Sequence, residues 1–112
     1  YDESLLQNIL RSLTLDELKL ILKSRIISRT KRCKNGLKTY KHVVWYTSDN
    51  NLKQRIIDTL SKILKAIEPK LVNAIKVRDR EIIIYSQQVV HLLTRIGLIA
   101  RDLAKKKDLG AV

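Results

Sequence analysis

Apolar positions recur three or four residues apart over much of the chain, a spacing that places them on one side of a helix. The pattern predicts helices over 3–12 and after Thr14, where Thr14-Leu-Asp-Glu17 forms a capping box. It is most regular over 50–67, and Pro69 ends that helix. The apolar stripe of 50–67 consists of Leu52, Ile56, Leu60, Ile63, Leu64 and Ile67.

The helical spacing fades between residues 25 and 46. Asn35-Gly36 is typical of a tight hairpin turn, because both residues tolerate the positive φ of a type I′ turn. The flanking segments contain β-branched and aromatic residues, as strands do. We therefore expect a short basic β-hairpin or an ordered loop at about 25–46.

The second half is more apolar and its elements are harder to separate. We expect a short helix near 69–76, a charged break at 78–81 and a buried helix over 82–96, although Ile82–Tyr85 alone could be a strand. Gly97 would end that helix with a positive φ, and 98–107 would form a terminal helix. The predicted fold class is mainly α, a small helical bundle in one domain over 1–112. The chain starts at Tyr1 and lacks Met, which indicates an N-terminally trimmed fragment.

The positive charge of the chain indicates what kind of partner it binds. The chain carries 23 Lys and Arg against 11 Asp and Glu, a net charge of +12, which indicates a polyanionic partner. Residues 28–46 contain cations and no acid. We expect five cations there to contact nucleic-acid phosphates: Arg29, Lys31, Arg32, Lys38 and Lys41.

Aromatic residues follow the same segment. Trp45, with Tyr40 or Tyr46, could stack on a base. The alternative is that Trp45 belongs to the core beside Val43 and Val44, with the charges merely solvated.

Arg78 and Arg80 stand just before the expected buried helix. If a helix begins there, its free amides and two guanidiniums would attract phosphate. The alternative is a surface network formed by Arg78, Asp79, Arg80 and Glu81.

Motifs for catalysis or metal binding are missing. His42, His91 and Cys33 have no zinc-motif spacing, and there is no Walker loop, GxGxxG motif or close carboxylate pair in an apolar stretch. We expect a protein that is not an enzyme and has no intrinsic cofactor. One cysteine rules out an internal disulfide and favours a reducing, cytoplasmic location. No apolar run is long enough for a membrane span, so we expect no membrane partner.

A family resemblance covers roughly residues 67–105. The order is Glu68-Pro69, a short helix, Arg78-Asp-Arg80, an apolar helix holding Tyr85, and then LLTRIGLIARDLAKK. This resembles the helical accessory module of archaeo-eukaryotic primases. It is similar to the C-terminal domain of the primase large subunit and to the helix-bundle domain of archaeal plasmid primases. It is most similar to the small archaeal primase subunit PriX.

The resemblance implies a non-catalytic accessory subunit in DNA replication. It would bind the initiating nucleoside triphosphate, ATP or another, and the single-stranded DNA template, beside the primase catalytic and large subunits. Arg78 and Arg80 match the basic pair that grips the phosphates, Tyr85 matches an aromatic residue, and Arg95 stands near a family lysine. Any Mg²⁺ would arrive with the nucleotide. Large-subunit domains also hold an iron–sulfur cluster through four cysteines, which Cys33 alone cannot do, so the resemblance implies kinship with the cluster-free members.

Two other classes stay open. A winged-helix-like regulator of duplex DNA would use the basic hairpin as its wing, but it needs a recognition helix before the wing, and 25–30 is too short. An assembly subunit would be held by the apolar helix 82–96 and would expose a large apolar patch.

Overall fold

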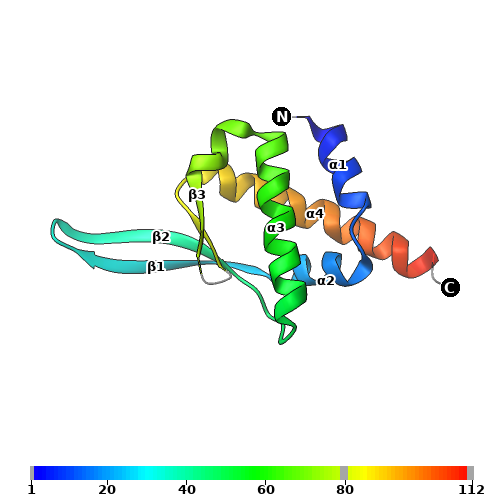
Figure 1. The fold of residues 1–112 in the computed structure, drawn as a ribbon, viewed down its shortest axis with the longest axis horizontal. Coiled ribbons are helices and arrows are strands. Elements are labelled where there is room, and N and C mark those ends of the chain that lie inside the picture. Colours follow the sequence, from blue (N-terminus) through cyan, green and yellow to red (C-terminus); the bar gives the residue numbers. More distant parts are fainter. Residues whose placement is uncertain (1, 79–80, 111–112) are drawn as a thin grey trace.

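The computed structural model describes residues 2–78 and 81–110, which form a helical body with a long β-hairpin projecting from it (Figure 1). The molecule measures 56 × 32 × 19 Å, and the hairpin accounts for its elongated shape. In chain order the elements are α1 (Glu3–Arg11), α2 (Leu15–Lys23), β1 (Arg25–Cys33), β2 (Gly36–Val44), α3 (Asn50–Ile67), the 3-10 helix η1 (Pro69–Ala74), β3 (Ile75–Arg78), β4 (Glu81–Ile84) and α4 (Gln87–Gly110).

The predicted fold class is wrong, because the fold is α+β rather than a helical bundle. The described residues include a four-stranded antiparallel sheet in the order β1-β2-β4-β3. Of the two alternatives expected at 25–46, a short hairpin or an ordered loop, the hairpin is present, as the nine-residue strands β1 and β2. The second hairpin, β3 and β4, lies where the sequence predicted parts of two helices.

The 75–84 segment is extended because β2 offers it a partner. Ile83 pairs with His42, and Ile82 pairs with Val43 on one side and Val77 on the other. Ile82 and Ile84 are buried while Ile83 is only half-buried, so the run alternates as a strand does. An apolar run of this length does not by itself distinguish a strand from the start of a buried helix.

The expected break at Gly97 is also wrong. α4 runs through Gly97 without interruption, and the positive φ occurs at Gly36 instead. The helix continues because Leu92, Ile96 and Ile99 keep facing the core, where all three are buried.

The helices predicted from caps and periodicity are confirmed. The Thr14 hydroxyl accepts from the Glu17 amide at 3.2 Å, and the Glu17 carboxylate accepts from the Thr14 amide at 3.1 Å. α3 spans the predicted residues, with the Asp49 side chain accepting from the Leu52 amide at 3.0 Å. Its stripe is buried from Ile56 to Ile67, with Leu52 half-buried.

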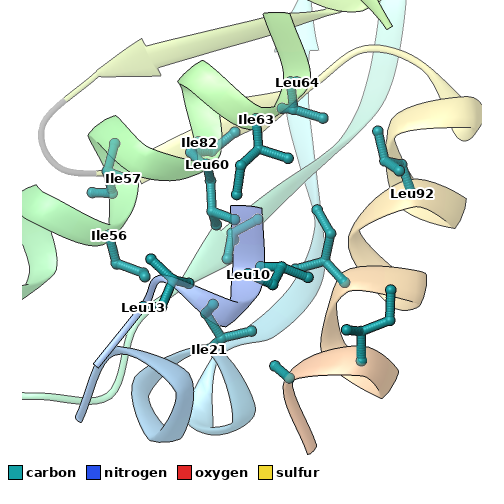
Figure 2. Packing of buried hydrophobic residues seen from close by; sticks show 14 of the residues in the cluster. Leu10, Leu13, Ile21, Ile56, Ile57, Leu60, Ile63, Leu64, Ile82 and Leu92 are labelled. Carbon is teal, nitrogen blue, oxygen red and sulfur yellow. The ribbon is translucent and has the colours of Figure 1, made fainter. Parts of the chain in front are cut away.

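One hydrophobic core joins the helices to one face of the sheet. Figure 2 shows Leu10, Ile21, Leu60 and Leu92 converging from four helices, with Ile82 of β4 beside α3. Val43, Ile82 and Ile84 form the sheet's contribution, which defines its core-facing side. The other side of the sheet is the outer face.

The structure bears on two further expectations from the sequence, the helix needed before a DNA-binding wing and the membrane span. Ser24 alone separates α2 from β1, so no further helix lies between α2 and the hairpin. No helix in the described part of the chain combines the length and the apolar character needed to cross a bilayer.

Candidate nucleic-acid interface

The basic segment forms an arm, defined here as residues 28–41 of the β1–β2 hairpin. β4 pairs with β2 only from Lys41 to Val43, so beyond Lys41 the arm is a two-stranded ribbon. It extends away from the helices (Figure 1). Six residues per strand, from Ser28 to Cys33, give a reach of about 20 Å.

The arm turns at Lys34-Asn35, between the paired residues Cys33 and Gly36. Gly36 has φ 115°, a conformation in which a Cβ is strained. The sequence predicted a turn centred on Asn35-Gly36, but the observed turn is centred one residue earlier, on Lys34-Asn35. Gly36 is the first residue of β2.

The register assigns each arm residue to a face, because directly paired residues share a face and neighbours along a strand alternate. One face carries the pairs Arg29–Tyr40 and Lys31–Lys38, and it continues into the outer face of the sheet. The opposite face carries Ser28–Lys41, Thr30–Thr39 and Arg32–Leu37. Both faces therefore present cations.

Lys31 and Lys38 are directly opposite each other. Like charges in this position destabilise a strand pair. The arm contains no acid, and none of its cations forms an ion pair with a described residue. The repulsion is thus not relieved by the protein's own described side chains, and a polyanion would relieve it.

The cations of the arm are accessible. Four of the five predicted phosphate ligands are exposed, and Lys41 is half-buried. The four exposed ones are Arg29, Lys31, Arg32 and Lys38, and Lys34 in the turn is exposed too. The structure brings all five predicted residues onto one hairpin, three on β1 and two on β2.

The outer face adds cations that the sequence did not assign to the site. Arg25 and Lys76 share a face with Lys31, as successive pairings through Ile27, His42 and Ile83 show. Both are exposed. Alternation along 75–78 would have placed Lys76 on this face had the segment been recognised as a strand, but α3 and η1 separate it from the arm in the chain.

The predicted aromatic residues are not brought together. Trp45 is 4% exposed and belongs to the core, so it has no open face for stacking. Tyr46 is exposed but lies past the end of β2, beside Lys19 and Lys23 of α2. Tyr40 alone is on the arm, and it is half-buried near the arm's base.

A histidine–glutamate pair anchors the base of the arm. His42 is 1% exposed, between its cross-strand partners Ile27 and Ile83. Its Nδ1 lies 3.0 Å from Oε2 of Glu81 on β4. The sequence indicates His42 only as a candidate metal ligand and holds no local signal for this contact.

Two of the three residues expected to hold a triphosphate, Arg78 and Arg95, lie on separate elements. Arg78 ends β3 opposite Glu81, and α4 begins only at Gln87, so the expected helix N-terminus after Arg78 is wrong. Arg95 lies on α4, where its Nε donates to Oε1 of Glu3 at 2.9 Å. Arg80 lies outside the described residues.

Tyr85, the aromatic residue of the primase resemblance, lies close to the arm's base. It is 61% exposed and borders a groove of about 240 Å³ with Tyr40, Lys41 and Gln87. Within 2–78 and 81–110, no three His, Cys, Asp or Glu side chains gather where they could hold a metal ion.

Comparisons with protein-family models, with curated proteins and with solved structures find no match to this chain.

Proposed function

We propose that this protein binds nucleic acid through the arm, by contacts between its cations and backbone phosphates. The observation that supports this most directly is the Lys31–Lys38 pair, two opposed cations in an acid-free ribbon. Directly opposed like charges lower folding stability, and a ligand that binds only the folded state raises it. A polyanion supplies that stabilisation and releases its condensed counterions on binding.

The shape of the arm supports the same function. It extends from the helical core, so its side chains are available without rearrangement of the body (Figure 1). Arg25 and Lys76 extend the positive surface from the arm onto the outer face of the sheet. The net charge of +12 attracts a polyanion from a distance, and the arm provides the contacts.

The primase resemblance supplies a rival form of this proposal. In that form the ligands are a single-stranded template and a nucleoside triphosphate, and the protein assists a separate catalytic subunit in the cytoplasm. It is supported by the residue order of 67–105 alone. Its own test is a titration with ATP and Mg²⁺, in which replacing Arg78 and Arg80 together by Ala should weaken binding about tenfold. An unchanged ATP affinity would reject the triphosphate site.

The general proposal is tested by salt dependence. Binding of a labelled DNA is measured by fluorescence anisotropy at several salt concentrations, for the natural chain and for K31A/K38A. Losing two phosphate contacts should reduce the slope of log K against log salt by about 2. The matched control is K105A/K106A, which removes two exposed cations from the C-terminal part of α4.

The control should keep the slope of the natural chain, because both variants lower the net charge equally and only one alters the arm. If the two variants behave alike, general electrostatic attraction explains the binding and the proposed site is wrong.

A further inference from the structure

We infer that the arm enters the major groove of duplex DNA, with its two faces toward the two phosphate-lined walls. This inference rests on the proposed function and names the class of nucleic acid. It is carried by the distribution of charge over the two faces of the ribbon, by the aromatic residues and by the ribbon's dimensions.

Cations lie on both faces of the arm. Lys31 and Lys38 point to one side, and Arg32 and Lys41 to the other. A ribbon lying flat on a single strand meets phosphates on one face only, and its other cations would remain un-neutralised. A ribbon between two sugar-phosphate walls neutralises both faces at once.

Aromatic side chains are scarce where a single strand would need them. Proteins that hold single strands combine cations with aromatic rings on which bases stack. From Ser28 to Thr39 the arm contains no aromatic residue, and Tyr40 is half-buried at its base. The two threonines that face each other in the middle of the arm, Thr30 and Thr39, offer hydroxyls suited to phosphate oxygens or base edges.

The dimensions of a two-stranded ribbon agree with one groove. The major groove of B-DNA is about 12 Å wide and 8.5 Å deep and admits such a ribbon. Side chains hold stacked sheets about 10 Å apart, so a ribbon with side chains on both faces exceeds the minor groove's width of about 6 Å. The A-form major groove of duplex RNA is too narrow for entry.

The end of the arm is suited to the groove floor. Leu37 is 70% exposed beside Arg32, the largest exposed fraction among the described large apolar side chains. An isolated apolar side chain is costly in water but can contact the methyl group of thymine in the major groove. Burial of Leu37 on DNA would therefore add to the electrostatic contribution.

The first experiment separates this inference from the proposed function. The full chain is titrated with a mixed-sequence DNA duplex, with each of its single strands and with the RNA duplex of the same sequence. The DNA duplex should bind at least about tenfold more tightly than any of the others. Equal or tighter binding of a single strand would overturn the inference and leave the arm's phosphate binding intact. Absence of binding to all four would overturn the proposed function itself.

The second experiment assigns the groove. Replacing cytosines of the duplex by glucosylated 5-hydroxymethylcytosine fills the major groove, and affinity should fall at least about tenfold. Netropsin, which occupies the minor groove of A·T tracts, should leave the affinity of the unmodified duplex unchanged. The reverse pattern would overturn the assignment.

The third experiment reports on the arm itself. Cys33 is the chain's single cysteine and adjoins the turn, so one maleimide fluorophore labels the end of the arm. Its emission should change on duplex binding, whereas a label at residue 106 in the C33S/K106C variant should not respond. A label at Cys33 that is indifferent to duplex would show that the arm stays outside the groove.

Discussion

The imidazole Nδ1 of His42 lies 3.0 Å from Oε2 of Glu81, across the strand boundary where the arm joins the β3–β4 hairpin. His42 is buried, whereas the Glu81 side chain, at the start of the inner strand β4, is 44% exposed. The second imidazole nitrogen, Nε2, is buried and has no partner among the described residues. The pair therefore depends on a single contact, and it links the arm to the rest of the sheet.

Removing the Glu81 carboxylate alone should lower the free energy of unfolding more than removing both members of the His42–Glu81 pair. Glu81→Ala leaves Nδ1 buried without this partner and should lower the free energy of unfolding by about 1–3 kcal/mol. His42→Leu places an apolar group between Ile27 and Ile83 and should change stability by less than about 1 kcal/mol. Urea denaturation of both single variants and of H42L/E81A measures the coupling.

The double variant should be more stable than E81A alone. Asp102→Ala removes an exposed carboxylate on α4 and serves as the control, with an effect within about 0.5 kcal/mol. If E81A matches D102A, the contact does not stabilise the fold.

Reversing the charge of Lys38 in the arm should raise folding stability and weaken DNA binding. Lys38→Glu converts the like-charged pair with Lys31 into an opposite-charged one and should raise the free energy of unfolding by about 0.2–1 kcal/mol. The same change should weaken DNA binding, because it replaces an attraction for phosphate by a repulsion. Thermal unfolding and anisotropy on the same preparation measure both effects.

Lys34→Glu provides the comparison, since Lys34 sits in the turn without a cross-strand partner. It makes the same change in net charge and should leave stability within about 0.5 kcal/mol of the natural chain. A K38E variant that is less stable than K34E would contradict the opposed-lysine explanation.

The two internal glycines should respond oppositely to alanine. Gly97 lies inside α4, and a Cβ there would meet no atom within 4 Å, so Gly97→Ala should stabilise the protein by about 0.5–1 kcal/mol. Gly36 has φ 115°, so Gly36→Ala should destabilise it by about 1 kcal/mol or more. Urea midpoints of the two variants check the signs, and a destabilising G97A would indicate a helix break at that position.

The single tryptophan should report on the core and not on DNA. Trp45 is 4% exposed, so its emission should be blue-shifted, weakly quenched by acrylamide and unchanged when DNA binds. The W45F/Y40W variant moves the indole to the base of the arm, where DNA should change its emission. Quenching of Trp45 by DNA in the natural chain would restore the stacking role.

The helices that were predicted correctly from the sequence were predicted from capping residues and apolar periodicity. The capping box at Thr14 and the stripe of 50–67 act within one turn or one helix, so their outcome depends little on distant residues. The arm was predicted for the same reason, since a glycine that accepts positive φ and β-branched flanks specify a hairpin locally.

The helical-bundle prediction was wrong at 82–84, where the same apolar run is compatible with either a helix or a strand. Ile82–Ile84 could begin a buried helix or form a strand, and pairing with Lys41–Val43 decided for the strand. An isolated glycine weakens a helix and therefore predicts a stop at Gly97, but burial of Ile96 and Ile99 on either side offsets that cost.

The sequence by itself determined the three helices before residue 68, the position of the arm and the concentration of positive charge on it, because each of these depends on interactions between near neighbours. Only the tertiary structure decided that 75–84 is a second hairpin, that Trp45 is buried, that Lys76 shares the arm's outer face, and that His42 meets Glu81. These depend on strand pairing and packing between residues far apart in the chain, whose free energies no local pattern contains.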